Sequence, residues 1–246
     1  MNYPLKFRRL KIIFLSFIFL IGWTYSHAQD KDDTFDIKKS SFILPQPLPA
    51  WKYSHSIGIS YVVLPKDWTL DALNVPMLMY NAKYTLPYGF NFQAGLSTLF
   101  VSNRLNFGPF WNHSFNNYHV GIGYQVAFLF GYLGSFGYQT AIYGWEQQPS
   151  LVLGYSFKKA ALTLRGDLYW TNSLNVDEGG HTIPTTSSFL NGFGVTASYE
   201  QRLYKNKLMT FGVKVSQLRY HFLAWPAFPV NQYRYIVPEF QLSLKF

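Results

Sequence analysis

The sequence predicts an all-β protein, an antiparallel transmembrane β-barrel of about ten strands. Three observations carry this prediction: an export signal with no later long apolar run, apolar residues that alternate with small or polar ones, and 20% aromatic residues beside only 13% charged ones. A soluble domain normally carries about a quarter charged residues. The chain has no cysteine, which excludes a disulfide scaffold, a zinc ribbon and a thiol nucleophile.

The N-terminus has the three parts of a secretory signal peptide. Four basic residues within 6–11 precede an uncharged run over 12–22, and Ser26-His27-Ala28 offers a small-x-small cleavage site. The apolar run is too short for a spanning helix, which needs about 20 residues. We therefore expect a signal peptide over 1–28. Its removal takes four basic residues and no acidic ones, so the net charge falls from +9 to +5; the remaining basic residues are scattered, which argues against nucleic-acid binding.

Residues 29–50 differ in character from the rest of the chain. The first half of this segment is polar and charged, and the second half contains three prolines. We expect a flexible periplasmic segment that leads into the barrel domain over 51–246. The alternative is that this segment docks into the barrel lumen, or onto a periplasmic partner through residues 42–50.

Apolar and polar residues alternate with a period of two along the predicted strands, which indicates a wall with two different environments on its faces. In 160–170, Leu162, Leu164, Leu168 and Trp170 alternate with Thr163, Arg165, Asp167 and Tyr169, and the same pattern recurs in 90–100, 118–130 and 207–216. A membrane barrel requires it, because lipid contacts one face of each strand and the lumen the other. A soluble β-sandwich instead exposes many Lys, Glu and Thr. The pattern therefore favours a barrel whose outer face contacts lipid.

Ten segments with strand character follow one another along the chain. We expect strands at 53–64, 75–86, 89–101, 104–113, 118–131, 149–158, 160–172, 189–203, 207–222 and 232–246. The links between them alternate in length, short then long, and only the third link, Ser102-Asn103-Arg104, breaks the alternation. Short periplasmic turns and longer extracellular loops are typical of membrane barrels, so both termini are expected in the periplasm. Counts of eight or twelve strands stay open.

Tryptophan and tyrosine prefer the two interfaces of a bilayer. The tryptophans of the predicted barrel fall near predicted strand ends: Trp51 and Trp111 at the periplasmic side, and Trp68, Trp145, Trp170 and Trp225 at the outer side. We therefore interpret them as membrane-interface aromatics, with outer-membrane lipids as their partners.

The last strand carries a recognisable pattern. Phe240, Leu242, Leu244 and Phe246 alternate, and the sequence finishes on phenylalanine. This resembles the C-terminal signature of bacterial outer-membrane β-barrels, and the likeness implies insertion into the outer membrane of a Gram-negative bacterium by the barrel-assembly machinery. The high Tyr, Phe and Asn content is similar to that of Bacteroidota outer-membrane barrels with no assigned activity. Pro238 departs from the pattern, because proline removes a ladder hydrogen bond; we expect a bulge there, and Pro109 raises the same expectation.

Inward positions carry few charges. They are Lys83, Arg165, Asp167, Glu200, Arg202, Lys214, Glu239 and Lys245. Counted from the periplasmic end, Arg165 lies level with Glu200, and Lys214 with Glu239, so we expect these as opposite-charge pairs. They form either a polar plug or the lining of a narrow pore or small-ligand site. Eight strands leave room only for side chains, so a pore of ten strands would be narrow.

An enzyme is the alternative from another class. Its candidates are His181 with Asp177 and Glu178, then His221, Asp67, Asp71 and Glu146, but no signature spacing connects them. No metal motif or phosphate-binding glycine loop is present, so we expect no cofactor. The sequence thus favours a structural, narrow-pore or solute-binding membrane protein. The alternatives are an outer-membrane enzyme with its site at the extracellular rim, or an accessory of an envelope secretion or assembly complex.

Overall fold

The structure is a computed structural model of the 246-residue chain, and it describes residues 35–69, 74–134, 140–178, 181–183, 188–204, 207–224 and 232–246. Residues from Asp36 to Phe246 form one compact unit. None of the described helices is long and apolar enough to cross a membrane.

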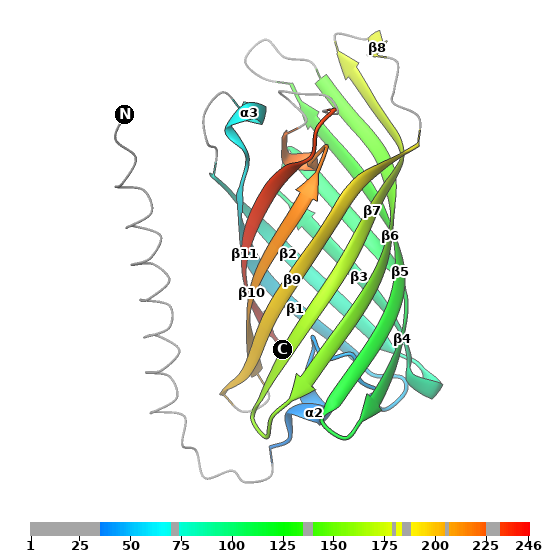
Figure 1. The fold of residues 1–246 in the computed structure, drawn as a ribbon, viewed down its shortest axis with the longest axis vertical. Helices are drawn as coiled ribbons and strands as arrows, with labels where there is room; N and C mark the ends of the chain where they lie inside the picture. The colour runs from blue at the N-terminus through cyan, green and yellow to red at the C-terminus, as the bar shows by residue number, and fades with distance from the viewer. Residues whose placement is uncertain are drawn as a thin grey trace, which may run out of the picture. The chain divides into compact units, whose positions relative to one another are not determined.

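Ten strands form a closed antiparallel barrel, as the sequence predicts (Figure 1). They are β1 (Tyr53–Val63), β2 (Asn74–Thr85), β3 (Phe90–Thr98), β4 (Ser102–Phe115), β5 (Tyr118–Leu133), β6 (Thr140–Ser156), β7 (Ala160–Glu178), β9 (Phe189–Tyr204), β10 (Lys207–Leu218) and β11 (Tyr235–Lys245). Each strand pairs with its neighbours along the chain, and β1 pairs with β11 to close the ring. The short strand β8 (His181–Ile183) pairs antiparallel with the end of β7.

The two ends of the barrel differ in their connections. The tight connections at 86–89, 116–117 and 157–159 lie at one end, together with the adjoining ends of β9 and β10; we call it the turn end, and it is the lower end in Figure 1. The opposite, loop end carries the other connections, with the short helices α3 (Lys66–Thr69) and η2 (Phe222–Ala224). Helix α2 (Ile37–Ser40) lies at the turn end, and η1 (Pro87–Gly89) forms one of its turns.

The main differences from the predicted strands lie around the fifth and seventh links. Strand β6 begins at Thr140 and not at 149, and β7 continues to Glu178, so both links are shorter than expected. Pro149, the first residue of the predicted strand, lies inside β6, where the β6–β7 pairing skips from Gln147 with Trp170 to Ser150 with Asp167. A proline is tolerated there because its position needs no ladder hydrogen bond.

The bulges expected at two prolines are not observed. Near Pro109 the pairing of β4 with β5 is interrupted between Phe107 and Phe110, but the register is the same on both sides. Pro238 pairs with Val215 in regular register, and the pairing of β11 with β1 ends one residue later, at Glu239. In both cases an unpaired ladder position accommodates the missing N–H without a bulge.

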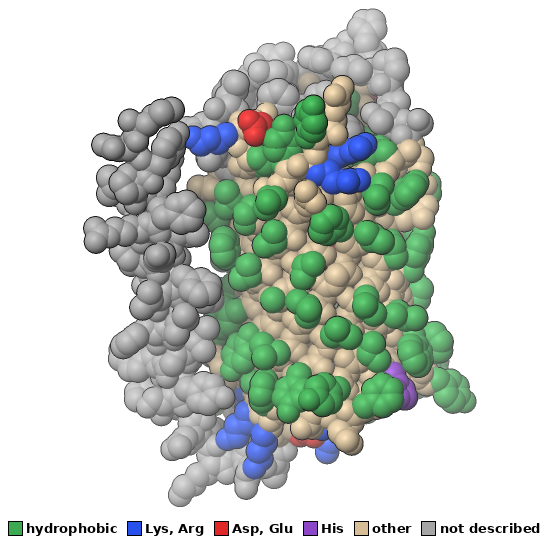
Figure 2. Space-filling model, viewed as in Figure 1, with side chains coloured by type: hydrophobic (Ala, Val, Ile, Leu, Met, Phe, Trp, Pro, Cys, Tyr) green, Lys and Arg blue, Asp and Glu red, His purple; other side chains and the backbone are tan. Residues whose placement is uncertain are grey.

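The two faces of the barrel wall divide as the alternation predicts. Leu164 and Val215 are 48% and 47% exposed on the outer face, whereas Asp167 is 5% exposed on the inner face. Figure 2 shows hydrophobic side chains spread over the visible wall, with Lys and Arg near its ends. A water-soluble barrel would reverse this distribution.

An apolar cluster of buried residues lies at the loop end of the barrel. Its members come from strands and from the loop-end connections, and we call it the loop-end cluster: Val62, Leu64, Trp68, Val75, Met77, Leu129, Ile142, Tyr169, Leu174, Leu218, Tyr220, Phe222, Leu223 and Val237. Helix α3 contributes Trp68, which packs edge-on against Tyr235 at 5.7 Å between ring centroids. Trp68 is 1% exposed, so its prediction as a membrane-interface residue is wrong.

Candidate functional site in the barrel lumen

The N-terminal segment occupies the turn end of the lumen. We call residues 36–46 the N-terminal plug; Ile37 and Leu44 are fully buried, and Gln46 is nearly so. At its start, Asp36 caps α2 by accepting from the Lys38 N–H. The flexible segment expected over 29–50 is therefore wrong for residues 36–46, whose docking into the lumen was the alternative. Residues 29–34 lie outside the described part of the chain.

Glu200 on β9 anchors this plug. Its carboxylate accepts hydrogen bonds from the Ser41 hydroxyl and from the Phe42 N–H, the latter at 3.2 and 3.1 Å to the two carboxylate oxygens. Thr210 on β10 donates to the same carboxylate at 3.3 Å. Glu200 thus binds the plug, and its expected pairing with Arg165 is wrong.

Two lysines hold the carbonyl groups of the plug. The Lys83 ammonium donates to the carbonyl oxygens of Phe42 and Leu44 at 3.1 and 3.4 Å. The Lys245 ammonium donates to the Ser40 carbonyl oxygen at 2.6 Å. These contacts satisfy buried charges and backbone groups together, as a buried polar assembly requires.

Two glycines shape the wall around the plug. A Cβ atom at Gly154 would lie 2.8 Å from both Leu44 Cδ2 and Pro45 Cδ, and one at Gly121 would lie 2.7 Å from Pro45 Cβ. Such distances are below normal van der Waals contact, so any side chain at these positions would displace the plug. The sequence of β5 and β6 is therefore matched in shape to residues 44 and 45.

The middle of the lumen contains a belt of paired charges, which we call the charged belt: Arg104, Glu146, Arg165, Asp167, Lys214 and Glu239. The Arg165 Nε lies 2.8 Å from an Asp167 carboxylate oxygen, and the Lys214 ammonium lies 3.5 Å from Glu239. The second pair confirms the predicted pairing of Lys214 with Glu239. In the first, Arg165 binds a residue of its own strand.

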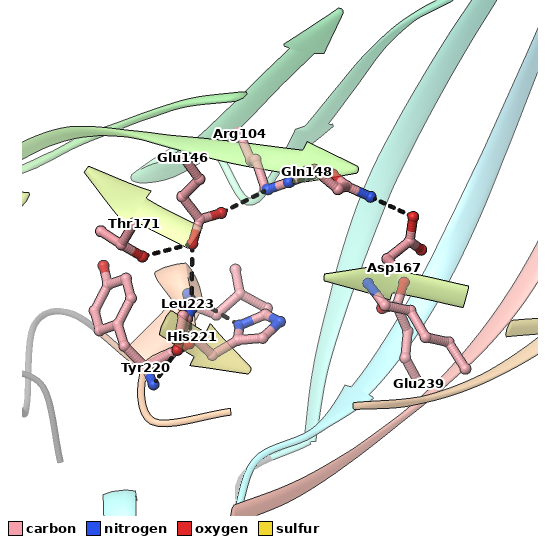
Figure 3. Close-up of polar contacts among 11 residues, drawn as sticks. Arg104, Glu146, Gln148, Asp167, Thr171, Tyr220, His221, Leu223 and Glu239 are labelled. Atoms are coloured by element: carbon pink, nitrogen blue, oxygen red, sulfur yellow. Dashed lines mark hydrogen bonds and ion pairs between the residues drawn. The ribbon is translucent and has the colours of Figure 1, made fainter. Parts of the chain in front are cut away.

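The third pair of the charged belt joins Arg104 on β4 to Glu146 on β6, at 3.5 Å (Figure 3). Gln148 links it to the Arg165 pair, because it accepts from Arg104 at 2.7 Å and donates to Asp167 at 2.9 Å. Sequence reasoning placed Arg104 at a link and Glu146 in a loop. Every second residue of a strand faces the same side. Continuing this alternation a few residues beyond the predicted ends of β4 and β6 would have assigned both residues to the lumen.

Glu146 also connects the charged belt to the loop end. It accepts hydrogen bonds from Thr171 and Asn191 at 3.1 Å each. The side-chain Oδ1 of Asn191 accepts from the backbone N–H groups of Arg219 and Tyr220 at 3.1 and 2.9 Å. These contacts fix the start of the β10–β11 connection over the lumen.

His221 belongs to this connection, outside the strands. Its Nδ1 accepts a hydrogen bond from the Leu223 N–H at 3.3 Å, and its ring stacks on Phe222 at 4.9 Å between centroids. Burial, with the positive charges of Lys214 and Arg104 nearby, lowers the pKa of His221 to about 3, while Glu239 acts in the opposite direction. The imidazole is therefore neutral at neutral pH.

A cavity of about 260 Å³ lies between the N-terminal plug and the loop-end cluster. Phe42 to Pro45 contribute to one end of its lining, and Tyr220, His221 and Phe222 contribute to the other. The wall between them presents the charged belt together with hydroxyl and amide side chains, including Ser56, Asn81, Gln93, Asn106, Thr163, Ser198 and Gln241.

The remaining predicted residues lie at several places. Trp51, Trp111 and Trp170 are exposed at 66%, 37% and 43%, Trp145 is half-buried, and Trp225 lies outside the described residues. Phe240, Leu242 and Leu244 lie on the outer face of β11, and Phe246 follows the end of that strand. Arg202 is half-buried near the turn end of β9.

The enzyme candidates do not form one group. Asp67 is exposed on α3, and Glu146 and His221 line the cavity at different places. The side chains of Glu178 and His181, and the whole of Asp71, lie outside the described residues, so the grouping of His181 with Asp177 and Glu178 stays a prediction. In the described part of the chain, no group of three His, Asp or Glu side chains is arranged to hold a metal ion.

Comparisons with known proteins give structural neighbours only. No family model and no curated protein sequence matches the chain. Neisserial surface protein A is 12% identical and covers 78% of this chain and 95% of its own, at a TM-score of 0.40. The attachment invasion locus protein of Yersinia pestis is 11% identical and covers 80% of this chain and 100% of its own, at a TM-score of 0.31. A FadL homologue of Pseudomonas aeruginosa is 8% identical and covers 87% of this chain and 95% of its own, at a TM-score of 0.36. These neighbours are bacterial outer-membrane β-barrels.

Proposed function

We propose that this protein is an integral outer-membrane β-barrel of a Gram-negative bacterium. Its exterior supports this, since Ile59, Leu164 and many similar side chains are about half exposed along the wall. An apolar surface of this extent would aggregate in water, and a closed barrel satisfies its backbone hydrogen bonds without water. The turn end lies in the periplasm, and the barrel-assembly machinery recognises β11. The Bacteroidota likeness stays a prediction.

We further propose that the lumen holds a small solute and does not act as an open pore. One observation carries this: the 260 Å³ cavity lies between the N-terminal plug and the loop-end cluster. A barrel of ten strands is only slightly wider than one of eight, which side chains fill completely. Here two separate groups of residues fill the two ends, and a polar space is left between them.

The paired charges agree with a binding role. Each basic residue of the charged belt lies within 3.5 Å of an acidic one. A pore selective for anions or cations uses rings of one charge sign. The charged belt presents balanced charge, which supports a rigid polar wall and not a path for ions.

Single-channel recording in planar bilayers tests the closed lumen. We expect no conductance steps from the full-length protein, and none when Gly154→Val displaces the plug alone. Steps are expected when Gly154→Val is combined with Phe222→Gly and Leu223→Gly, which also remove apolar side chains at the loop end. Steps from the unmodified protein would overturn the closed lumen.

Membrane fractionation tests the location separately. We expect the protein in the outer-membrane fraction, extracted only by detergent, with an electrophoretic mobility that changes on boiling as the barrel unfolds. Recovery of the folded chain in a detergent-free soluble fraction would contradict the membrane assignment.

A further inference from the structure

The three ion pairs of the charged belt are balanced in number, but their two members are not equally accessible. The side chains of Arg104, Arg165 and Lys214 are 14%, 26% and 22% exposed. The side chains of their carboxylate partners are only 5%, 4% and 6% exposed, in the same order. All six residues line the cavity between the N-terminal plug and the loop end. The accessible part of the charged belt is therefore positive.

Neutral donors of the wall hold the carboxylates of the charged belt. The Asp167 carboxylate accepts hydrogen bonds from Gln148 and Ser150 at 2.9 and 2.5 Å. The Glu239 carboxylate accepts one from Gln241 at 2.8 Å, and the third carboxylate of the belt accepts two at 3.1 Å each. The negative charges thus face the wall, and the wall stabilises them together with the basic residues.

The two arginines of the charged belt retain donors that the wall does not use. A guanidinium has five N–H groups. In Arg104 and in Arg165, the contacts with the wall use only the Nε and Nη2 atoms. The Nη1 atom of each, with two N–H groups, makes no hydrogen bond to a described residue, and neither atom belongs to the buried unpartnered atoms of the lumen. Both Nη1 atoms therefore have accessible surface.

The three basic groups lie close together. The Arg104 guanidinium and the Lys214 ammonium lie 5.9 and 5.4 Å from the centroid of one ring, that of Tyr169. Gln148 connects Arg104 to the carboxylate that pairs with Arg165 (Figure 3). Accessible positive groups from β4, β7 and β10 are thus gathered in one part of the lumen.

The plug side of the lumen adds to the positive charge. One carboxylate, that of Glu200, lies there with two ammonium groups, those of Lys83 and Lys245, which donate to carbonyl oxygens of the plug. A charge acts over a longer distance in a protein interior than in water, because the effective dielectric constant is lower. This end of the lumen therefore also favours an anion over a cation.

From these observations we propose that the lumen binds a small anionic solute through an oxyanion group, a phosphate or a carboxylate. Arg104 and Arg165 donate to it from Nη1, and Lys214 supplies a third positive charge. Guanidinium groups match the paired oxygen atoms of phosphates and carboxylates. This rests on the proposed function, because an open pore would hold such a solute only in passing.

Isothermal titration calorimetry in an uncharged detergent and a buffer without oxyanions tests the proposal. The probes are inorganic phosphate and succinate, with glycerol as the neutral and ethanolamine as the cationic counterpart. The full-length protein and the Gly154→Val variant with its displaced plug are both titrated, so that a blocked entrance cannot hide the site.

We expect at least one anionic probe to bind with a dissociation constant of about 1 mM or lower, and the neutral and cationic probes to bind at least about tenfold more weakly. No binding of either anion to either protein, or equally tight binding of glycerol or ethanolamine, would overturn the proposal.

Matched substitutions locate the site. Lys214→Gln removes an accessible positive charge, and Glu239→Gln removes the negative charge of the same pair. We expect Lys214→Gln and Arg165→Gln each to weaken anion binding about tenfold or more, the usual effect of one hydrogen bond to a charged group. Glu239→Gln should bind the anion at least as tightly as the unmodified protein. Lys159→Gln, exposed at the turn end and outside the cavity lining, should leave binding unchanged.

These variants separate a binding site from a general disturbance of the lumen. A structural effect would weaken binding in Lys214→Gln and Glu239→Gln alike, and adsorption to surface charges would make Lys159→Gln as weak as Lys214→Gln. Either result would contradict binding at the charged belt. Heat-modified mobility confirms that each variant is folded.

The two proposals fail in different ways. If planar bilayers show no steps and calorimetry shows no anion binding, the lumen is closed and only the ligand class is wrong. If the unmodified protein conducts, the closed lumen is wrong, whatever calorimetry shows.

Discussion

The described residues at the two ends of the lumen make different kinds of contact. At the turn end, a segment that precedes the first strand is held by one carboxylate, that of Glu200, and by the ammonium groups of Lys83 and Lys245. At the loop end, the loop-end cluster consists of side chains from the strands and their own connections. The turn end thus contains a separate segment that polar contacts hold in place, and the loop end contains the apolar core of the barrel.

This difference predicts different responses to mutation. The stabilisation from burying apolar side chains is roughly proportional to the area removed from water and is spread over many contacts. The loop-end cluster therefore contributes to the stability of the whole barrel. Hydrogen bonds to charged groups are few and specific, so changing one of them should release the plug and leave the barrel folded. The predictions below test this separation, from the largest expected effect to the smallest.

Trp68→Ala should lower the free energy of unfolding of the barrel by about 3–5 kcal/mol, because it leaves a large void in the loop-end cluster. Unfolding in urea, followed by tryptophan fluorescence and by heat-modified mobility, measures this change. Trp170→Ala is the control, because this tryptophan is 43% exposed on the outer face and should change stability less. Similar losses in both variants would contradict the distinction between cluster and wall.

Glu200→Gln should release the N-terminal plug while the barrel stays folded. The substitution keeps the size of the side chain but removes the charge that strengthens the bonds from Ser41 and Phe42, worth about 2 kcal/mol. Because the chain has no cysteine, Ile43→Cys provides a unique thiol, whose rate of modification by a water-soluble maleimide reports plug exposure.

We expect modification about tenfold faster or more in the Glu200→Gln background. Glu239→Gln is the matched control, since that carboxylate pairs with Lys214 in the charged belt and makes no contact with the plug. Faster labelling in the control alone would contradict the anchoring role of Glu200.

Gly154→Ala should also expose the plug, but by a smaller factor. The added methyl group would lie 2.8 Å from Leu44 and Pro45, an overpacking that typically costs about 1–3 kcal/mol. Gly166→Ala on the next strand is the control, because a Cβ there meets nothing within 4 Å. The same thiol assay measures both variants, and equal labelling rates would show that shape matching at Gly154 does not hold the plug.

Acidification should weaken the loop end gradually. The pKa of His221 is about 3 in the folded protein and 6.5 when unperturbed, so the unfolded chain takes up the proton first. The contribution of a neutral His221 to stability is therefore complete above pH 6.5 and falls as the pH decreases toward 3. His221→Gln should flatten this part of the stability profile by roughly 1 kcal/mol per pH unit. Urea titrations at several pH values measure it, and an unchanged slope would contradict the burial of a neutral histidine.

Much of the barrel followed from the sequence, and the site followed only in part. The alternation in β7 assigned Leu164 outward and Asp167 inward, because a strand has a strict period of two and its two faces meet different environments. The boundaries of β6 and β7 were predicted less well, because the gap in the β6–β7 pairing that accommodates Pro149 inside β6 depends on the neighbouring strand and is not visible in the sequence.

The contacts of the charges depended on register and on the plug. Arg165 and Glu200 lie on neighbouring strands, but Glu200 pairs across to Ala161 and Thr210 and so lies next to the plug, while Arg165 lies higher in the lumen. Counting residues from strand ends cannot find such a difference, because the strands of a barrel are tilted and staggered. Trp68 shows the same limit, since its burial depends on how α3 folds over the loop end.

The sequence by itself determined the closed ten-stranded wall and the faces of that wall, because these depend on local composition and on a short period; the export signal stays a prediction. Only the tertiary structure decided what fills the lumen. The plug, the charged belt and the loop-end cluster join residues up to 205 positions apart, as Ser40 and Lys245 are, and such contacts are fixed by strand stagger and side-chain packing, which no local pattern encodes.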